Sequence, residues 1–345
     1  MKADQLRSGT LWKIIIHEND ISAQNSDGER VAIDGTDALD LSHGDIIEVL
    51  TDNRVVRLHN GKSSSALIYI TNQCNSNCIM CPDSETARQK QNTITKQFLL
   101  DYVSLLPSDL LHIDITGGEP TLLKEGLVEV IASTFKVVET AEVQVLTNGR
   151  SFADEKYTMQ FEPFSKNRLY IEIPIHAGEG KLHDKIAGIR GAFDQTCKGI
   201  KLLQRYKIPV GIRVVVQKLN IWHLTDIIDM IANHYPNIMY IDFLGLEVMG
   251  NAFKNKDDVW IEFDDVKHFL ENAVEHCLYR GIEPRLFNYP LCLFEKKYWY
   301  CYKNSITDHK IRYMDACETC PMINRCGGFF STTIHNTTFQ ARPIK

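Results

Sequence analysis

The alternation of strand-like and helix-like segments between residues 66 and 281 constrains the fold of this chain most strongly. Short runs rich in β-branched and apolar residues are separated by longer runs with the spacing of amphipathic helices. The predicted strands are 66–70, 111–115, 142–146, 168–175, 210–216 and 238–244, and the predicted helices are 93–106, 122–135, 191–206, 223–235 and 263–281. Such alternation favours a parallel sheet, because parallel strands need crossover connections.

About six strand–helix units are too few for a closed eight-stranded barrel. A partial barrel or an open doubly wound sheet would fit this number of units, and we expect an α/β fold with a partial (β/α)6 barrel. Within the first helical run, Thr95 is expected to be the N-cap, because its hydroxyl can accept a backbone hydrogen bond. From about Leu286 the regular alternation stops and cysteines accumulate.

The first 60 residues follow a different pattern. Short β-rich runs such as LWKIIIH, DIIEVL and RVVRLH alternate with turn signals such as SDGE and SHGD. We therefore predict a small β-rich domain over residues 1–62. The strand–helix region would follow at 63–285, and a cysteine-rich extension would occupy 286–345.

Composition and charge limit the functional class. The 345 residues are 44% hydrophobic with a formal net charge of −6, which allows a sizeable core and lacks the basic footprint of a nucleic-acid-binding protein. There is no signal peptide pattern and no stretch near the roughly 20 apolar residues of a membrane helix. We expect a soluble cytoplasmic protein without nucleic-acid or membrane partners. Its clustered cysteines would then bind metal rather than form disulfides.

Three cysteines follow the first strand of the alternating region directly. Cys74, Cys78 and Cys81 lie in the sequence CNSNCIMCP, at the strand end where parallel α/β folds place their sites. A cubane iron–sulfur cluster usually has four cysteine ligands, so three thiolates would leave one iron open. One alternative is a zinc site, which needs a fourth Cys or His. The other is a set of buried thiols, which the polar residues between the first two cysteines disfavour.

This CxxxCxxC pattern resembles the radical S-adenosylmethionine (SAM) superfamily, and the resemblance extends over residues 66–250. It implies that Cys74, Cys78 and Cys81 hold a [4Fe–4S] cluster whose open iron binds SAM. Members of the superfamily cleave SAM reductively into methionine and a 5′-deoxyadenosyl radical, which abstracts a hydrogen from the substrate. The resemblance also implies that Met80 packs near the adenine.

Loops after the second and third strands carry further candidate ligands. Gly117, Gly118, Glu119 and Pro120 form a GGEP motif in which the glycines allow close backbone approach. By the resemblance this motif binds the SAM amino group, and the alternative is an ordinary turn. Asn148 would lie near the floor of the site, unless it only forms an Asn-Gly turn.

The next three strands add three candidates. His176 would contact the SAM ribose by the resemblance, or else cap its strand. Arg213 lies in an apolar strand, where a charge is costly without an anionic partner. The resemblance pairs it with the SAM carboxylate, and the alternative is a structural ion pair. Leu246 would line the adenine pocket.

A second group of cysteines lies near the C-terminus. Cys317, Cys320 and Cys326 have the spacing CxxCx5C, and Cys292 would complete a set of four, with Cys301 as the competing fourth ligand. Both zinc and a second iron–sulfur cluster fit four cysteines. The segment resembles the auxiliary-cluster extensions of SPASM or twitch type, although the cysteine expected soon after Cys326 is missing. We expect one auxiliary [4Fe–4S] cluster, with zinc as the alternative.

A closer resemblance is to the C-type radical SAM maturase of the His-Xaa-Ser system. It rests on the segments NQCNSNCIMCP, DITGGEPTLL, HDKIAGIRGAFDQT and CETCPMINRCGGFF, together with LGLEVMG and SITDHK. This resemblance implies a ribosomally made peptide or protein as substrate and a paired radical SAM maturase as partner. An electron donor such as flavodoxin or ferredoxin would supply the reducing electron.

Two other functions remain open. A radical SAM enzyme acting on a small molecule or nucleotide, or activating another enzyme, would keep every residue of the first site. A non-catalytic iron–sulfur or zinc module would make the GGEP motif and Arg213 coincidental.

Overall fold

The computed structural model of the protein describes residues 6, 9–17, 20–32, 41–52, 54–166, 168–303 and 310–344. The chain forms two compact units. The first unit comprises residues 1–71, 91–146 and 166–169, and the second comprises 72–90, 147–165 and 170–345. Of the segment SITDHK, only Lys310 is among the described residues.

The first unit begins with an antiparallel sheet of five strands in the order β3-β2-β1-β4-β5. Its strands are β1 (Leu11–His17), β2 (Asp20–Gln24), β3 (Arg30–Ala32), β4 (Ile46–Val49) and β5 (Val55–His59). Trp12, Ile14 and Ile47 are fully buried and form the centre of its core. The predicted β-rich character of the N-terminal part is therefore confirmed.

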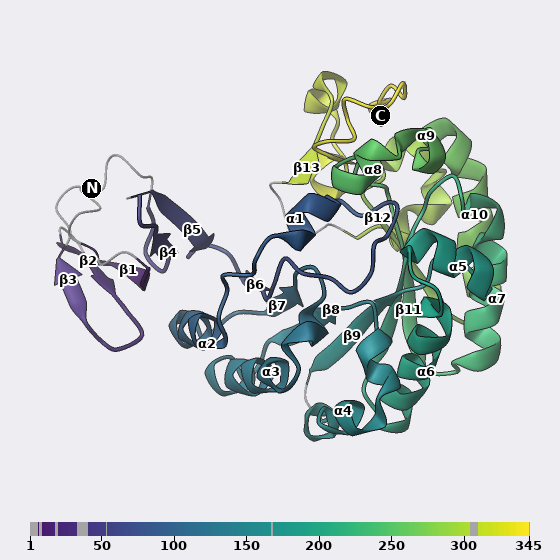
Figure 1. The fold of residues 1–345 in the computed structure, drawn as a ribbon. Helices are drawn as coiled ribbons and strands as arrows, with labels where there is room; N and C mark the ends of the chain where they lie inside the picture. Colours follow the sequence, from purple (N-terminus) through teal and green to yellow (C-terminus); the bar gives the residue numbers. More distant parts are fainter. Residues whose placement is uncertain are drawn as a thin grey trace. The chain divides into compact units, whose positions relative to one another are not determined.

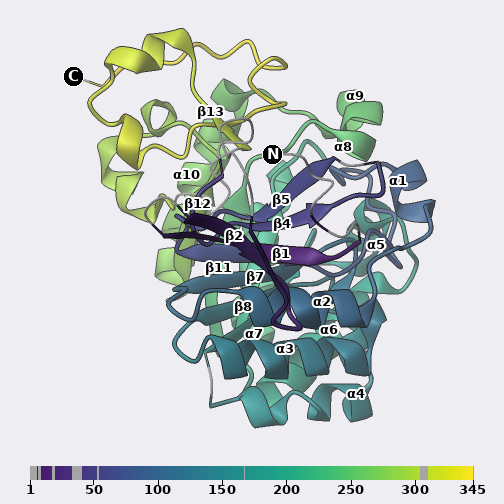
Figure 2. The ribbon, with the colours of Figure 1, turned by 90° about the vertical axis from the view of Figure 1, so that its left-hand side faces the viewer.

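The same unit contains three parallel strands and two helices. The strands are β6 (Ser65–Tyr69), β7 (His112–Thr116) and β8 (Glu142–Leu146), and the helices α2 (Lys96–Leu105) and α3 (Glu125–Val137) lie side by side, as Figures 1 and 2 show. Thr95 is the N-cap of α2 as predicted, since its Oγ1 accepts a hydrogen bond from the Phe98 backbone N at 3.1 Å. The Tyr102 hydroxyl on α2 donates to the Leu58 carbonyl on β5 at 3.3 Å.

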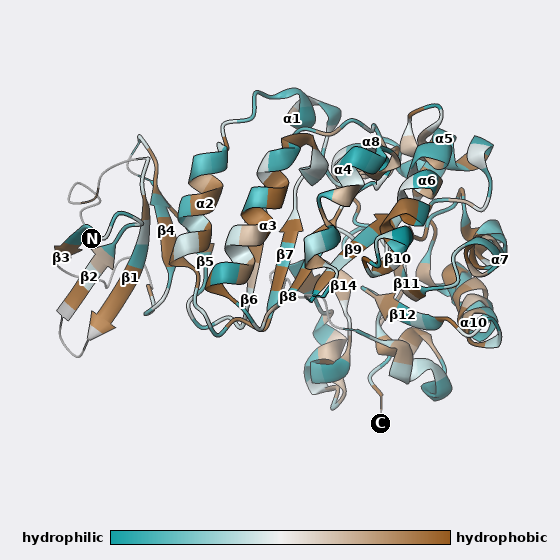
Figure 3. Cartoon of the chain, turned by 90° about the horizontal axis from the view of Figure 1, so that it is seen from below, coloured by the Kyte–Doolittle hydropathy of each residue, from teal (hydrophilic) through white to brown (hydrophobic). Residues whose placement is uncertain are grey.

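The second unit is built on parallel strands followed by helices. The strands are β9 (Leu169–Pro174), β10 (Val210–Val215), β11 (Ile238–Leu244) and β12 (Glu283–Phe287), and the longer helices are α5 (Gly180–Ala187), α6 (Ala192–Arg205), α7 (Leu224–His234) and α10 (Phe263–Tyr279). Alternate strand residues such as Ile173, Ile212 and Phe243 are fully buried. Figure 3 shows the brown of hydrophobic residues along β9 and β10.

Within each unit the parallel strands are ordered as in the sequence, β6-β7-β8 in the first unit and β9-β10-β11-β12 in the second. This order follows the sequence and never reverses, as in barrel winding and unlike a doubly wound sheet. The predicted α/β fold class is confirmed. Strand β12 was not predicted, because Pro284 and Arg285 interrupt its apolar pattern. A proline is tolerated there since β12 is an edge strand.

Short elements complete the chain. They are α1 (Glu85–Gln89), η2 (Pro120–Leu123), η3 (Arg150–Ala153), α4 (Glu155–Met159), η4 (Glu162–Phe164), η5 (Ile221–His223), α8 (Gly250–Lys254), α9 (Lys256–Val259), η6 (Leu291–Leu293), η7 (Lys296–Cys301), β13 (Ile311–Arg312), η9 (Asp315–Thr319), η10 (Ile323–Arg325) and β14 (Phe329–Phe330). Strands β13 and β14 pair antiparallel. No helix among the described residues is long and apolar enough to cross a membrane. The division at residues 62 and 285 stays a prediction.

Candidate cluster and cofactor site

The loop of the first cysteine triplet rests on the C-terminal end of α5. The backbone N of Asn77 donates to the Ala187 carbonyl at 3.1 Å, and the backbone N of Ile79 donates to the Ile186 carbonyl at 2.9 Å. Gly188 caps α5 with a φ of 67°, and a Cβ at this position would lie 2.2 Å from the Asn77 carbonyl oxygen. Only glycine combines this left-handed backbone with so close an approach of the loop.

Helix α8 and the residue that ends it donate hydrogen bonds to backbone carbonyl groups of the same loop. The Asn251 Nδ2 donates to the Cys78 carbonyl at 3.0 Å, and the Ala252 backbone N donates to the Cys81 carbonyl at 3.2 Å. The Asn255 Nδ2 donates to the Ile79 carbonyl at 3.0 Å. Several backbone polar groups of the loop are therefore paired with α5, α8 and Asn255, which fixes its position against these elements.

The polar residues between the first two cysteines are also paired. The Arg150 Nη1 donates to the Asn75 carbonyl at 2.6 Å and to the Ser76 Oγ at 3.1 Å. The Asn148 Nδ2 donates to the Asn75 Oδ1 at 2.7 Å, which places this predicted site residue against the cysteine loop. These contacts explain why a loop so rich in polar side chains is held in place.

The three thiols of this loop fit an iron–sulfur cluster chemically. Cys74, Cys78 and Cys81 are partly exposed, and none forms a disulfide. Burial, together with the neighbouring Cys81 and Cys74 thiols, raises the pKa of the Cys78 thiol to about 12. Iron would therefore have to displace protons from these thiols on binding. Three cysteine sulfurs that influence one another are the donor set of a cubane with one open iron.

The GGEP motif lies in the first unit, at the end of β7. Gly117 has a φ of 147°, and a Cβ there would lie 2.4 Å from the Thr71 carbonyl oxygen. The Gly118 backbone N donates to the same carbonyl at 2.6 Å. A glycine at position 117 is thus needed for the close approach of two strand ends, and Gly118 contributes a backbone hydrogen bond.

Glu119 is fully buried and caps the turn η2, which begins at Pro120. Its Oε1 accepts hydrogen bonds from the Thr121 backbone N at 3.0 Å and from the Thr121 Oγ1 at 2.6 Å. A carboxylate held by these donors has a fixed orientation. Its predicted contact with the SAM amino group stays a prediction, as do the contacts of the other three residues of the motif.

His176 is buried just beyond the end of β9 and faces a second histidine. Its backbone N donates to the His183 Nδ1 at 3.2 Å, and the two ring centroids are 4.9 Å apart. Burial keeps the pKa of His176 well below its usual range, and His183 lowers it further. Among the described residues, the His176 Nδ1 has no hydrogen-bond partner. A neutral ring with an unpaired nitrogen suits the predicted ribose contact, which stays a prediction.

Arg213 forms a structural ion pair, the alternative that the sequence left open. Its Nε lies 3.3 Å from the Glu172 Oε2, and Glu172 also accepts a hydrogen bond from the Tyr240 hydroxyl at 2.8 Å. Asp242 lies beside Arg213 in the sheet register. Burial raises the pKa of Asp242 well above its usual range, and Glu172 raises it further. Arg213 is therefore engaged with protein carboxylates, and its contact with SAM stays a prediction.

The two residues expected near the adenine belong to one apolar cluster. Met80 and Leu246 are nearly buried and share this cluster with Ile186, Val248, Ala252 and Val259. The Leu246 carbonyl accepts a hydrogen bond from the Thr333 Oγ1 at 2.7 Å, which ties the loop after β11 to the C-terminal segment. The structure thus brings together two residues far apart in sequence, as an adenine pocket would require.

Four of the C-terminal cysteines line a common pocket, whereas Cys301 is buried outside it. Cys292, Cys317, Cys320 and Cys326 line one pocket together with apolar side chains. Cys301 is only 1% exposed and does not line this pocket. The arrangement supports Cys292, rather than Cys301, as the fourth ligand of this set.

Zinc is the competing occupant of the C-terminal pocket. A zinc site draws its ligands to within about 2.3 Å of one point. In the part of the chain that the structure describes, no group of three or more His, Cys, Asp or Glu side chains is arranged to hold a metal ion. This holds for both cysteine sets and does not distinguish zinc from an iron–sulfur cluster. The assignment of the pocket rests on the four cysteines that line it.

Several residues that hold the cysteine loop were not predicted. Gly188 lies in the segment HDKIAGIRGAFDQT, and Asn251 directly follows LGLEVMG. Both segments contribute to the family resemblance, but no role was predicted for these two residues. Arg150 and Asn255 belong to no sequence motif from which a role could be predicted. These residues hold the cysteine loop only because tertiary folding places their helices beside it. The local sequence pattern does not predict that placement.

Residues 68–231 match the radical SAM superfamily. The chain carries a radical SAM domain. The match begins within β6 and includes the cysteine loop, the GGEP motif and β10. The matched region covers the residues that the sequence assigned to the first cluster.

Three curated relatives share this domain. The sporulation killing factor maturation protein SkfB of Bacillus subtilis (strain 168) is 28% identical over 171 residues, which are 49% of this chain and 40% of SkfB. The antilisterial bacteriocin subtilosin biosynthesis protein AlbA of the same organism is 26% identical over 199 residues, covering 53% and 43%. A probable GTP 3′,8-cyclase of Saccharolobus islandicus (strain Y.N.15.51 / Yellowstone #2) is 28% identical over 195 residues, covering 56% and 61%.

The chain thus spans less than half the length of SkfB and AlbA. Among solved structures, SuiB of Streptococcus suis superposes with a TM-score of 0.51 at 15% identity, covering 69% of this chain and 51% of SuiB. At this identity the likeness concerns the fold alone. The likeness to SuiB supports the fold of the chain, and the radical SAM domain rests on the match of residues 68–231.

Proposed function

We propose that this protein is a radical SAM enzyme that modifies a ribosomally made peptide or protein. The observation that carries the proposal is the cysteine loop of the radical SAM domain. Its backbone is held by α5 and α8 while three thiols remain as ligands. In this proposal Cys74, Cys78 and Cys81 hold a [4Fe–4S] cluster. When bound, the cluster supplies the electron that cleaves SAM and so starts hydrogen abstraction from the substrate.

The chain's own residues would bind and orient SAM. Met80 and Leu246 would pack against the adenine, because they share one buried apolar cluster. Glu119 would hold the amino group with Gly117, Gly118 and Pro120, since its carboxylate is oriented by two hydrogen bonds. Asn148, His176 and Arg213 would complete the site near the cysteine loop, the ribose and the carboxylate.

A peptide substrate is supported by the named functions of two relatives. SkfB is named for the maturation of a killing factor and AlbA for the biosynthesis of a bacteriocin. The C-terminal set of Cys292, Cys317, Cys320 and Cys326 would hold an auxiliary [4Fe–4S] cluster. The resemblance to the His-Xaa-Ser system adds a paired maturase and a flavodoxin or ferredoxin as the proposed partners.

A nucleotide or other small molecule is the second candidate substrate. The specific observation in its favour is the relative named as a probable GTP 3′,8-cyclase, of which the match covers a larger share than it does of SkfB or AlbA. This candidate uses the same cluster and SAM residues. Only the substrate distinguishes it from the peptide maturase.

A direct comparison of substrates tests the proposal. The anaerobically reconstituted protein is incubated with SAM, dithionite and the small polypeptide encoded beside its gene, and in parallel with GTP. We expect a mass change in the polypeptide that depends on SAM and is absent with Cys78→Ala. Conversion of GTP with an unchanged polypeptide would contradict peptide maturation while leaving the radical SAM assignment intact.

A further inference from the structure

The C-terminal segment of the chain covers the pocket of the second cysteine set. Ala341, Arg342, Pro343 and Ile344 line this pocket together with the four cysteines. The backbone N of Arg342 lies 3.4 Å from the Cys292 Sγ and donates to it. The backbone N of Ala341 donates to the Met314 Sδ, also at 3.4 Å. The segment therefore contacts the cysteine pocket through its backbone.

Contacts before and beside this segment fix its path. Phe339 is 2% exposed, and its ring lies 5.8 Å from the Phe263 ring and 6.1 Å from the Phe329 ring. The Glu262 Oε2 accepts hydrogen bonds from the Thr337 Oγ1 at 2.8 Å and the Thr338 backbone N at 3.1 Å. The chain is thus held in place before it reaches the cysteines.

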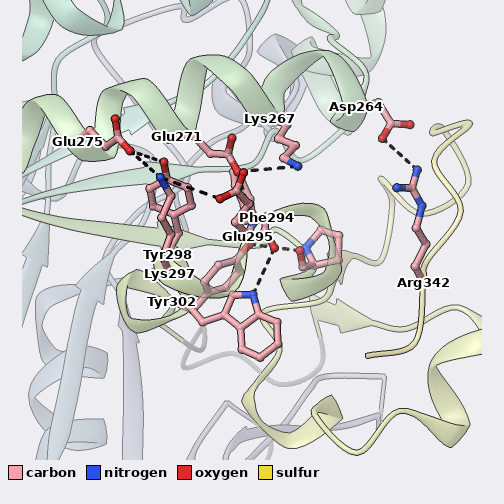
Figure 4. A network of polar contacts seen from close by, with 12 residues as sticks. Asp264, Lys267, Glu271, Glu275, Phe294, Glu295, Lys297, Tyr298, Tyr302 and Arg342 are labelled. Carbon is pink, nitrogen blue, oxygen red and sulfur yellow. Dashed lines mark hydrogen bonds and ion pairs between the residues drawn. The ribbon is translucent and has the colours of Figure 1, made fainter. Parts of the chain in front are cut away.

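The Arg342 side chain forms an ion pair that does not involve the sulfur contacted by its backbone. Its guanidinium group is 3.6 Å from the Asp264 carboxylate on α10, as Figure 4 shows, and both side chains are largely exposed. An exposed ion pair of this kind contributes little to stability. The side chain and the backbone N–H of Arg342 therefore have separable roles.

A second backbone N–H group donates to a sulfur of the same four cysteines. The Leu291 N donates to the Cys326 Sγ at 3.3 Å. Backbone N–H groups that point at cysteine sulfurs stabilise the more negative, reduced form of a cluster. Hydrogen bonds to the sulfurs and solvent exposure are among the factors that set iron–sulfur reduction potentials.

We propose that residues 339–344 form a cover over the second cluster and that the Arg342 backbone N–H raises its reduction potential. This inference rests on the proposed auxiliary cluster at Cys292, Cys317, Cys320 and Cys326. One N–H group is lost when Arg342 is replaced by proline, whereas alanine keeps it. The cover also limits access of water to the cluster from the side of Cys292.

The test uses the full chain with Cys74, Cys78 and Cys81 changed to alanine, so that only the C-terminal site can hold a cluster. In this background Arg342→Pro removes the N–H donor, and Arg342→Ala removes only the ion pair with Asp264. Iron, sulfide and zinc are measured per chain. The midpoint potential is then determined by a redox titration followed by electron paramagnetic resonance.

We expect all three proteins to bind iron and sulfide, and only Arg342→Pro to shift the midpoint to a more negative potential. Loss of iron from Arg342→Pro but not from Arg342→Ala would support the same contact. Equal midpoints in the two variants would overturn the inference while leaving the cluster in place. Zinc without iron in the parent protein would instead overturn the auxiliary cluster itself.

Discussion

The carboxylate of Glu119 both caps the turn η2 and is the proposed ligand of the SAM amino group. Its Oε1 caps η2 through Thr121, and the proposed contact with the SAM amino group needs the negative charge of the same carboxylate. A neutral amide oxygen can still accept the capping hydrogen bonds. Cap and charge can therefore be separated by substitution.

Glu119→Gln should keep the fold and weaken SAM binding about 10-fold, because a charge-assisted hydrogen bond contributes roughly 1.5–3 kcal/mol. Glu119→Ala should weaken SAM binding at least as much and also destabilise the protein by about 1 kcal/mol through loss of the cap. Isothermal titration of the reconstituted protein with SAM, beside thermal unfolding, measures both effects. Unchanged SAM affinity in Glu119→Gln would argue against Glu119 as a ligand.

The burial of the His176–His183 pair should make the stability of the fold depend on pH. Burial lowers the pKa of His183 to about 4, and its Nδ1 accepts the backbone hydrogen bond of His176. An unfolded chain protonates this ring below its ordinary pKa of about 6.5. The folded protein keeps the ring neutral down to about pH 4. Its contribution to stability is thus complete above the ordinary pKa and is lost as the pH falls towards 4.

The free energy of unfolding should therefore fall between pH 6.5 and pH 5 more steeply for the wild type than for His183→Asn. The asparagine keeps an acceptor for the His176 N–H but does not titrate. At about 1.4 kcal/mol per pH unit, the difference is about 2 kcal/mol at pH 5 and reaches its full value only near pH 4. Urea unfolding of the metal-free proteins at several pH values measures it. Parallel pH profiles would show that His183 is not the group responsible.

At the residue scale, the sequence could predict which side chains stand at strand ends but not what they contact. Asn148 lies against the cysteine loop, and Met80 and Leu246 share one cluster, while their contacts with SAM stay predictions. The partner of Arg213 could not be chosen from the sequence. Glu172 is contributed by another strand, and only the sheet register brings the two together.

At the scale of elements, the cysteine loop depends on the C-terminal end of α5. Gly188 and Gly191 both have left-handed backbones, with φ of 67° and 78°. A Cβ on Gly188 would lie 2.2 Å from the Asn77 carbonyl, whereas a Cβ on Gly191 would meet nothing within 4 Å. The two glycines therefore form a matched pair that separates backbone strain from contact with the loop.

Gly188→Ala should reduce iron incorporation at the first site several-fold, because the loop must move away from α5. Gly191→Ala bears a similar left-handed backbone cost of about 1–2 kcal/mol and should load iron like the wild type. Iron and sulfide per chain after anaerobic reconstitution measure the effect. Equal loading of both variants would show that α5 does not position the loop.

Most long elements were predictable because their periodicity is strong, as in α2, where Thr95 also marks the start. Strand β12 was missed because Pro284 and Arg285 break its pattern. Helix α8 was missed because five residues give too short a periodic signal. Yet α8 binds the cysteine loop, so the least predictable element contributes directly to the candidate site.

For the whole molecule, the two cysteine sets lie far apart in the sequence but belong to the same compact unit. The segment 72–90 joins residues 170–345 in this unit, although the chain runs through the first unit between them. No local pattern in the sequence predicts such a partition. The radical SAM domain itself, by contrast, was predictable, since its cysteine spacing and GGEP motif are local.

The central claim is that the cluster at Cys74, Cys78 and Cys81 cleaves SAM. The most direct measurement is the formation of 5′-deoxyadenosine by the anaerobically reconstituted protein with SAM and dithionite. We predict that the wild type forms it and that Cys78→Ala does not, whether or not a substrate is present. Absence of 5′-deoxyadenosine from wild-type protein carrying a complete first cluster would contradict the account.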